Sequence, residues 1–291
     1  MERAQNPAIA PVAFILVAAF SVQGGAAIAK GIFPQIGVAG TASIRTVLAA
    51  ILLLAVFRPP VRRFTTAQWR AVVPYGIAIG LMNLLFYQAL ARIPLGLAVA
   101  LEFLGPLAVA ILGSRRAVDV VWVILAMAGI ALIAPFRADA AIDPAGVIYA
   151  LLTGACWAAY IILGGRVSQR LDAGVAASIG MTIAALTITP YALVAGGMEK
   201  FGLHLLVPSL AMAVLSSALP YALEMKALRV LPGRTFSVLM SLEPVIAALC
   251  GLVLLGEHLT QAQWAAVALV VIASAGAMSS VASRAGRSAD I

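Results

Sequence analysis

The stretch PLGLAVALEFLGPLAVAILGSRR, residues 94–116, contains the features that decide the fold of this chain. Residues 95–113 approach the roughly 18 to 20 apolar residues that cross a bilayer as a helix. One acidic residue, Glu102, lies in the middle of this run, Pro106 follows it, and two arginines end the stretch. The pattern predicts a membrane-spanning helix that carries a buried carboxyl group, is interrupted near the proline and ends in the cytoplasm.

Similar apolar runs recur along the whole chain. Of its 291 residues 63% are hydrophobic and 10% are charged, whereas globular proteins average about 45 to 50% apolar and about 25% charged residues. A single soluble domain is therefore excluded. With glycine, proline and charge clusters as boundaries, we expect an all-α membrane protein with ten transmembrane helices, at residues 11–33, 38–57, 71–91, 95–113, 118–136, 144–164, 175–197, 206–225, 233–255 and 262–281.

Two alternatives to this count remain open from hydropathy. The sixth to eighth segments are less apolar than the others, which also allows nine or eleven spans. The first segment has some features of a signal peptide, but its length and the apolar segments that follow argue against cleavage.

The net charge of +8 is best explained by membrane orientation, because the basic residues lie in short turns between apolar runs. With ten spans and a cytoplasmic amino terminus, fourteen of the nineteen lysines and arginines fall on the cytoplasmic side. The other side receives Lys30, Arg92, Arg137 and Lys200, and Arg45 falls within a span. This asymmetry predicts that both termini are cytoplasmic. We expect membrane lipid around the chain and no nucleic-acid partner.

The two halves of the chain resemble each other. A shift of 138 residues places residues 89–94 over residues 227–232, Pro106 over Pro244 and Gly113 over Gly251. The matches predict two five-helix repeats, residues 1–138 and 139–291. An odd number of helices in each repeat inverts the second repeat relative to the first, and such repeats form substrate sites at their interface near the midplane.

Four ionisable residues lie within predicted spans, where each charge costs about 2.5 to 3.5 kcal/mol and indicates a functional site. Glu102 is a candidate ligand for a substrate ammonium group or a site of protonation; alternatively, it pairs with Arg45 and stabilises helix packing. Glu224 lies near a cytoplasmic helix end, which also suits an interfacial charge. Glu243 is the fourth.

Prolines occupy corresponding positions in the two halves. Glu243 precedes Pro244, and Gly105 precedes Pro106. Each proline removes a backbone donor, so we expect one interrupted helix in each repeat. Paired interruptions point to a binding site, although a kink with a locally satisfied carboxylate is the alternative for Glu243.

A set of uncharged polar and aromatic residues supplies what a small polar solute needs in an apolar pocket. These residues also suit interhelical packing alone. Together with the two glutamates, the predicted substrate-binding set is Gln23, Asn83, Tyr87, Glu102, Trp157, Tyr160, Tyr221, Ser241 and Glu243. Candidates for structural or coupling roles are Arg45, Pro106, Glu224 and Pro244.

The sequence lacks the motifs of ATP hydrolysis and of metal-dependent catalysis. It contains no G-x-x-x-x-G-K-[ST] and no H-E-x-x-H motif, and its two cysteines lie in apolar runs without zinc spacing. We therefore expect no enzyme, no cofactor and no metal site, and we expect transport not driven by ATP hydrolysis in this chain.

Three stretches resemble the EamA branch of the drug/metabolite transporter superfamily, most closely its bacterial threonine/homoserine exporters. They are residues 21–26 (SVQGGA), residues 94–116 and residues 219–244 (LPYALEMKALRVLPGRTFSVLMSLEP). The resemblance implies ten helices in two inverted repeats, cytoplasmic termini, and a central cavity lined by the first, third, fourth, sixth, eighth and ninth segments.

The resemblance further implies export of small neutral amino acids across the bacterial inner membrane by alternating access. In this interpretation Glu102 binds the substrate ammonium group, and Asn83 with Gln23 or helix-break amides binds the carboxylate. Two alternatives remain. Trp157, Tyr160 and Phe103 would stack on an aromatic amino acid or a hydrophobic drug-like solute, or the chain would be a channel or receptor-like interaction protein without net turnover. The exact substrate, proton coupling and oligomeric state stay open.

Overall fold

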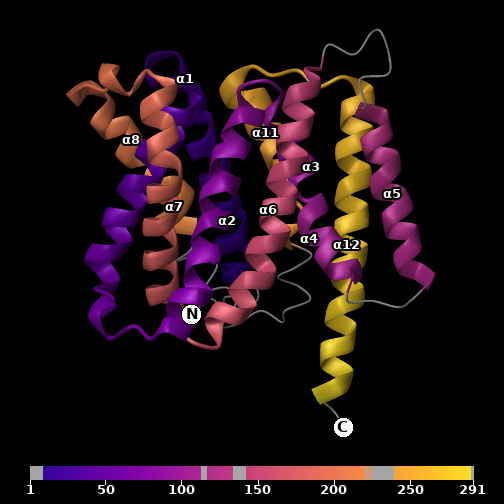
Figure 1. Cartoon of the computed structure of the whole chain (residues 1–291). Coiled ribbons are helices and arrows are strands. Elements are labelled where there is room, and N and C mark those ends of the chain that lie inside the picture. The colour runs from indigo at the N-terminus through magenta and orange to yellow at the C-terminus, as the bar shows by residue number, and fades with distance from the viewer. Residues whose placement is uncertain (1–8, 113–116, 134–141, 221–222, 224–238, 290–291) are drawn as a thin grey trace, which may run out of the picture.

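The computed structural model describes residues 9–112, 117–133, 142–220, 223 and 239–289, and the regular elements in these ranges are helical (Figure 1). The first half contains α1 (Ile9–Phe57), α2 (Thr66–Leu90), α3 (Leu95–Glu102), α4 (Leu104–Leu112) and α5 (Ala117–Ile133). The second half contains α6 (Pro144–Ser168), α7 (Ala173–Ala195), α8 (Leu206–Ala213), the π-helix η4 (Val214–Ala218), α11 (Glu243–Leu255) and α12 (Gln261–Ala289). Short 3-10 turns, η1 (Val61–Arg63), η2 (Met198–Lys200) and η3 (Leu203–Leu205), lie in the connections.

Gly37 divides α1 into two arms. The helix has 49 residues, and at 1.5 Å per residue it is about twice as long as a bilayer core is thick. Gly37 has φ 72° and ψ 167°, a conformation that glycine adopts without the steric cost of a Cβ atom. Each arm is long enough to cross a bilayer, in agreement with the first two predicted segments.

Local sequence sets the first turns of α2 and α6. Thr65 and Gln68 form a capping box at the start of α2, which satisfies two backbone donors that the helix leaves unpaired. At the start of α6, the Asp143 carboxylate accepts a hydrogen bond from the Ala145 N–H, and Pro144 occupies the first helical position.

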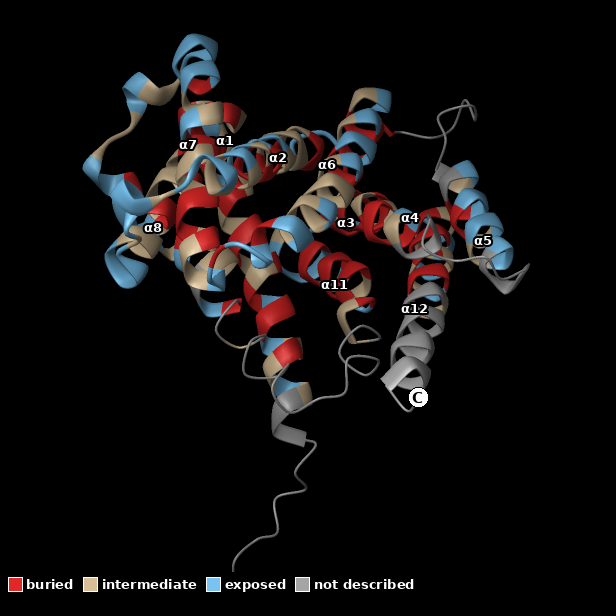
Figure 2. Cartoon of the chain, turned by 60° about the horizontal axis from the view of Figure 1, so that its bottom comes forward, coloured by how far each residue is buried: buried red, intermediate tan, exposed pale blue. Residues whose placement is uncertain are grey.

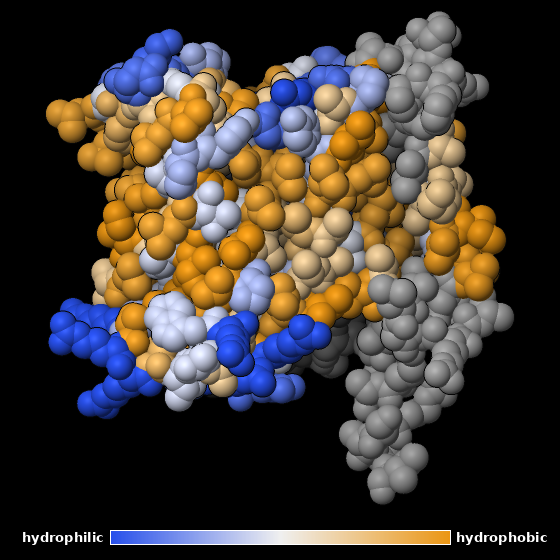
Figure 3. All heavy atoms as spheres, viewed as in Figure 1, coloured by the Kyte–Doolittle hydropathy of each residue, from blue (hydrophilic) through white to orange (hydrophobic). Residues whose placement is uncertain are grey.

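The outer surface carries an apolar belt. In Figure 3 a hydrophobic band runs around the visible face between two hydrophilic rims. Among the described residues, four helices are long and apolar enough to cross a membrane, and five further apolar helices are shorter. Large side chains such as Val194, Val253 and Leu186 are 88%, 77% and 70% exposed. This exposure is what a lipid environment permits and water disfavours.

A central hydrophobic cluster joins the two halves of the chain. It includes Ile36 of α1, Tyr87 of α2, Val99 of α3, Met212 of α8 and Ala247 of α11. Figure 2 shows the buried residues gathered on α1, α3, α4 and α11, whereas α5 is mostly exposed. A second cluster lies between α2, α6 and α7.

Both predicted helix interruptions are present. The fourth segment is divided into α3 and α4 at Phe103, and residues 241–242 form a turn immediately before α11. At the first interruption, Pro106 has no N–H to donate to the carbonyl of Glu102, which lies four residues earlier. The same chemistry therefore breaks a helix at matching positions of the two halves.

Candidate functional site

Gln23 and Glu243 connect the first helix to the start of α11. The Gln23 Nε2 donates a hydrogen bond of 3.2 Å to the Glu243 Oε1. Both residues are buried, and the Gln23 Oε1 has no hydrogen-bond partner among the described residues. Because the amide nitrogen faces a carboxylate, the free amide oxygen remains as an acceptor for an incoming donor.

Glu102 is the last residue of α3 and lies at the helix interruption. Its charge interacts with those of Glu243 and Arg45, so the three residues lie in one electrostatic neighbourhood. The side chain is nevertheless partly accessible. The predicted direct ion pair between Glu102 and Arg45 is absent from the described residues, because the Arg45 guanidinium is turned toward Tyr87 instead.

Arg45 lies against Tyr87. The Arg45 Nη1 donates a hydrogen bond of 3.3 Å to the Tyr87 hydroxyl, and the guanidinium carbon lies 5.5 Å from the centre of the tyrosine ring. The Tyr87 hydroxyl lies 3.5 Å from the Met212 Sδ, which is a weak acceptor. Tyr87 is 1% exposed. Its buried position is explained by these contacts with Arg45 and Met212.

A second polar group lies nearer to the end of the molecule at which α1 bends. Lys30 of α1 forms an ion pair with Glu257, and the other Glu257 oxygen accepts a hydrogen bond of 2.7 Å from the Leu95 N–H at the start of α3. Gln23 and Glu102 each lie two helical turns from this group along α1 and α3, or about 10 Å deeper. Sequence reasoning missed the role of Glu257, which lies two residues after the end of α11.

The two predicted aromatic residues of α6 belong to different clusters. The Trp157 ring packs edge-on against Phe103, with 4.9 Å between ring centres, and lies against the central cluster. The Tyr160 ring stacks on Tyr75 at 5.1 Å, in the cluster between α2, α6 and α7. Trp157 therefore packs at the helix interruption that follows Glu102, whereas Tyr160 packs in a different cluster.

The remaining predicted residues occupy varied positions. The Asn83 Nδ2 donates to the carbonyl of Ile79 in the same helix at 2.8 Å, while Ser241 is fully buried in the turn before α11. Pro106 and Pro244 are buried beside the two interruptions. Tyr221 and Glu224 lie outside the described residues.

Other features of the described residues do not add to this site. A surface pocket of about 410 Å³ lies between the start of α2 and the turn after α6, and none of the predicted substrate-binding residues lines it. No group of three His, Cys, Asp or Glu residues in the described ranges could hold a metal ion. The candidate site thus runs from Gln23 and Glu243 through Glu102 to Arg45 and Tyr87.

Comparisons with known proteins give the family. The EamA-like transporter family matches residues 144–279. The threonine/homoserine exporters RhtA of Escherichia coli (strain K12) and Salmonella typhimurium (strain LT2) are each 44% identical over 271 residues, which covers 93% of this chain and 92% of theirs. The uncharacterized transporter YwfM of Bacillus subtilis (strain 168) is 27% identical over 152 residues, about half of each chain.

A solved crystal structure with 20% sequence identity matches 92% of this chain and 95% of its own with a TM-score of 0.57, and thus shares its fold. The match to RhtA extends over nearly the whole chain, far beyond the residues that the family match covers. The chain therefore belongs to the EamA-like transporter family.

Proposed function

We propose that this chain exports small neutral amino acids of the threonine/homoserine type across the bacterial inner membrane. The observation that carries the proposal is the 44% identity to RhtA over 93% of the chain. The described helices support a multi-pass membrane transporter, and relatives and family alike are transporters and not enzymes. The substrate is a small molecule.

The proposed architecture has ten transmembrane helices in two inverted repeats, residues 1–138 and 139–291. The bend at Gly37 and the paired interruptions at Phe103 and at residues 241–242 support it. In this architecture both termini are cytoplasmic, and the substrate site lies where the interrupted helices of the two repeats meet. Gly96 of α3 supports this meeting point, because a Cβ atom there would lie 2.5 Å from the Ala248 Cα of α11.

The proposed site binds an amino acid at the polar groups between these helices. Glu102 with Glu243 and the Gln23 oxygen provides acceptors for an ammonium group, and Trp157 forms an apolar wall. The hydrogen bond between Gln23 and Glu243 supports this assignment, because it turns the amide nitrogen toward Glu243 and leaves the Gln23 oxygen without a partner among the described residues. Asn83, Tyr87, Tyr160, Tyr221 and Ser241 complete the predicted set, with Tyr160 the residue least supported by its surroundings.

Transport assays on purified protein test the proposed function. Vesicles containing the protein and preloaded with labelled threonine are expected to release it faster than protein-free vesicles, and external threonine should accelerate the release by exchange. A panel of phenylalanine, alanine and a hydrophobic cation separates the substrate classes. Absence of faster release for every solute would instead favour a receptor-like protein, and unsaturable release would favour a channel.

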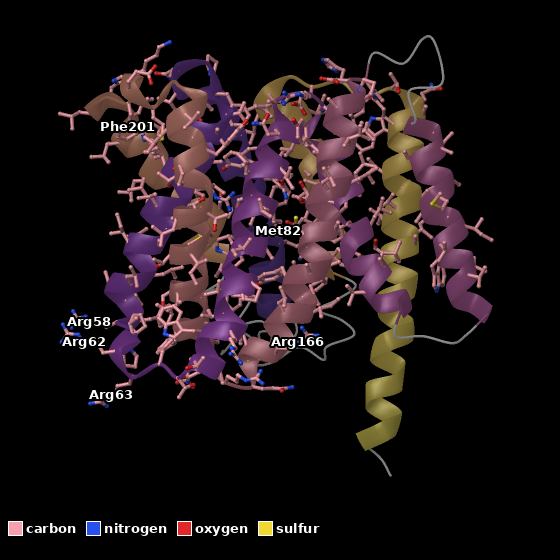
Figure 4. All side chains as sticks on the ribbon, in the orientation of Figure 1. Arg58, Arg62, Arg63, Met82, Arg166 and Phe201 are labelled. Carbon is pink, nitrogen blue, oxygen red and sulfur yellow. The ribbon has the colours of Figure 1, made fainter. Side chains whose placement is uncertain are left out.

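Labelling of introduced cysteines tests the topology. Arg58, Arg62, Arg63 and Arg166 lie at one end of the molecule and Phe201 at the other (Figure 4), and cytoplasmic ends carry the excess of arginine. In a variant without Cys156 and Cys250, cysteines at positions 92 and 200 should react with an impermeant reagent once the outer membrane is opened. Cysteines at 63 and 170 should react only after the inner membrane is permeabilised. The reverse pattern would contradict the proposed orientation.

Replacement of Trp157 by alanine separates small from aromatic substrates. If Trp157 is a wall, the variant should retain threonine release and admit phenylalanine, because removing the ring that contacts Phe103 enlarges the site. If Trp157 stacks on the solute, the apparent affinity for phenylalanine should fall about threefold to tenfold. We expect the first result.

Trp69→Ala is the matched control, since Trp69 packs on Phe64 at the arginine-rich end, with 5.3 Å between ring centres and away from the candidate site. Loss of phenylalanine release by the Trp157 variant, with no threonine release by the unmodified protein, would contradict the expected outcome.

A further inference from the structure

Two cations lie within the apolar run of α1, and only one of them has a carboxylate partner in the described structure. Lys30 forms an ion pair with Glu257. Arg45 forms none with any described residue, although it is partly buried and lies two turns inside the bend at Gly37. A charge within a membrane span is costly unless it is paired. Among the described residues, Arg45 is therefore the cation of α1 that has no carboxylate within ion-pair distance.

Tyr87 holds the Arg45 side chain in place without neutralising it. The guanidinium makes one hydrogen bond to the Tyr87 hydroxyl and lies over its ring, yet it has five N–H donors in a planar fork. The Tyr87 ring also packs against the Phe33 ring, with 5.5 Å between the ring centres. Several donors of a positioned guanidinium are thus unused by these contacts.

Glu102 is an acidic residue whose charge interacts with that of Arg45, although the two side chains are not within ion-pair distance of each other. An amino acid zwitterion has its positive and negative groups on adjacent carbons. It can therefore extend from a carboxylate to a guanidinium that lie near each other without touching.

Gln23 is a poor partner for the carboxylate of such a ligand. One N–H of its amide already donates to Glu243, whose charge repels a second carboxylate, and its amide oxygen is an acceptor. The carboxylates of Glu102 and Glu243 and the Gln23 oxygen are acceptors, which suits an ammonium group. The carboxylate needs a donor on the other side of the site.

We infer that Arg45 binds the α-carboxylate of the transported amino acid and thereby makes the transporter specific for free amino acids. The inference rests on the proposed function. It adds to the substrate class the chemical group that Arg45 recognises, the α-carboxylate. A guanidinium binds a carboxylate through two parallel hydrogen bonds. Tyr87 acts as a positioning residue that keeps the fork directed toward the site.

Competition between two ligands that differ only at the carboxylate tests this role. The ligands are L-threonine and L-threonine amide, in which an uncharged amide replaces the carboxylate. They compete with labelled threonine in counterflow into vesicles that contain the purified full-length protein. For the unmodified protein, threonine should compete at least about tenfold better than its amide, because a charge-assisted pair typically contributes this much or more.

Arg45→Gln should weaken competition by threonine at least about tenfold and competition by threonine amide less than about twofold. The preference for the free carboxylate therefore disappears. Arg45→Lys, which keeps the charge but not the fork, should retain part of the preference. If the glutamine variant does not yield folded protein, a preference left unchanged by Arg45→Lys overturns the inference.

Arg92→Gln is the matched control. Arg92 also lies over a tyrosine ring, 5.0 Å from the centre of Tyr149, but it is exposed at a helix end. Its replacement should leave the preference for threonine unchanged.

The outcomes separate the inference from the proposed function. A purely structural role of Arg45 predicts an equal loss for both ligands or a loss of thermal stability without a change in preference, and either result overturns the inference. Absence of threonine counterflow in the unmodified protein would overturn the proposed function and this inference together. Threonine counterflow with an unchanged preference in Arg45→Gln would overturn the inference alone.

Discussion

Replacement of Glu102 by glutamine is expected to reduce threonine efflux about 10- to 100-fold while the protein remains folded in the membrane. Glutamine preserves the size and shape of the side chain and removes its charge. A hydrogen bond to a charged group contributes about 1.5 to 3 kcal/mol, and each 1.4 kcal/mol changes an equilibrium constant about tenfold. The effect should be large because Glu102 lies at the interruption of its helix, within the electrostatic reach of both Glu243 and Arg45.

Efflux from preloaded vesicles and thermal unfolding of the purified variant measure the two expected properties separately. Glu199→Gln is the matched control, because Glu199 is exposed in η2 and accepts a hydrogen bond from the Gly197 N–H, outside the candidate site. Full transport by a stable Glu102→Gln protein would exclude Glu102 from the site.

A third variant separates substrate binding by Glu102 from charge balance with Arg45. If Glu102 serves only to offset the arginine, Glu102→Gln should lower thermal stability, and Glu102→Gln combined with Arg45→Gln should restore it, because the double variant buries no unpaired charge. Under the proposed function the double variant remains inactive as well as stable. Recovery of transport in the double variant would contradict a binding role for either residue.

The helix interruptions could be predicted from sequence because their cause is local. A proline four residues after Glu102 removes the donor that its carbonyl needs, wherever the helix packs. The membrane class followed from composition for a similar reason, since exposed apolar side chains need lipid around them. These features depend on residue type and spacing, which can be read from the sequence without knowing how the helices pack.

The partners of the polar side chains could not be predicted in the same way. Gln23 bonds to Glu243 across 220 positions of sequence, and Lys30 bonds to Glu257 across 227. Which helix faces which is decided by packing over the whole chain. Glu257 also lies just outside an apolar run, where a charge does not indicate a buried role, although its carboxylate accepts a hydrogen bond from the first residue of α3.

Trp157 and Tyr160 show a limit of helical periodicity. Residues three apart lie near one another on a helix surface but do not point in the same direction. Helix α6 packs against α2 and also against α3 and α4. The two rings therefore reach different neighbours, Phe103 for Trp157 and Tyr75 for Tyr160.

Replacement of Gly105 by alanine is expected to destabilise the protein by about 3 kcal/mol or more and to leave little folded material after extraction. Helix α4 crosses α6 where Gly105 meets Gly154. A Cβ atom at position 105 would collide with the Gly154 carbonyl oxygen and lie 2.7 Å from the Gly154 carbonyl carbon. Backbone atoms cannot rotate away as a side chain can. The two helices must separate, and Glu102, which directly contacts this crossing through its own carbonyl, must move with them.

A graded series on the same pair of helices tests this crossing by thermal unfolding and by the yield of monodisperse protein. Gly154→Ala should cost less than Gly105→Ala, since its Cβ atom would lie 2.9 Å from the Glu102 carbonyl oxygen and 3.3 Å from the Gly105 nitrogen. Gly165→Ala, also on α6, meets no atom within 4 Å and should be neutral or stabilising by up to about 1 kcal/mol through helix propensity. Equal stability of the Gly105 and Gly165 variants would mean that α4 and α6 do not cross at Gly105 and Gly154, and would also contradict the placement of Phe103 beside Trp157.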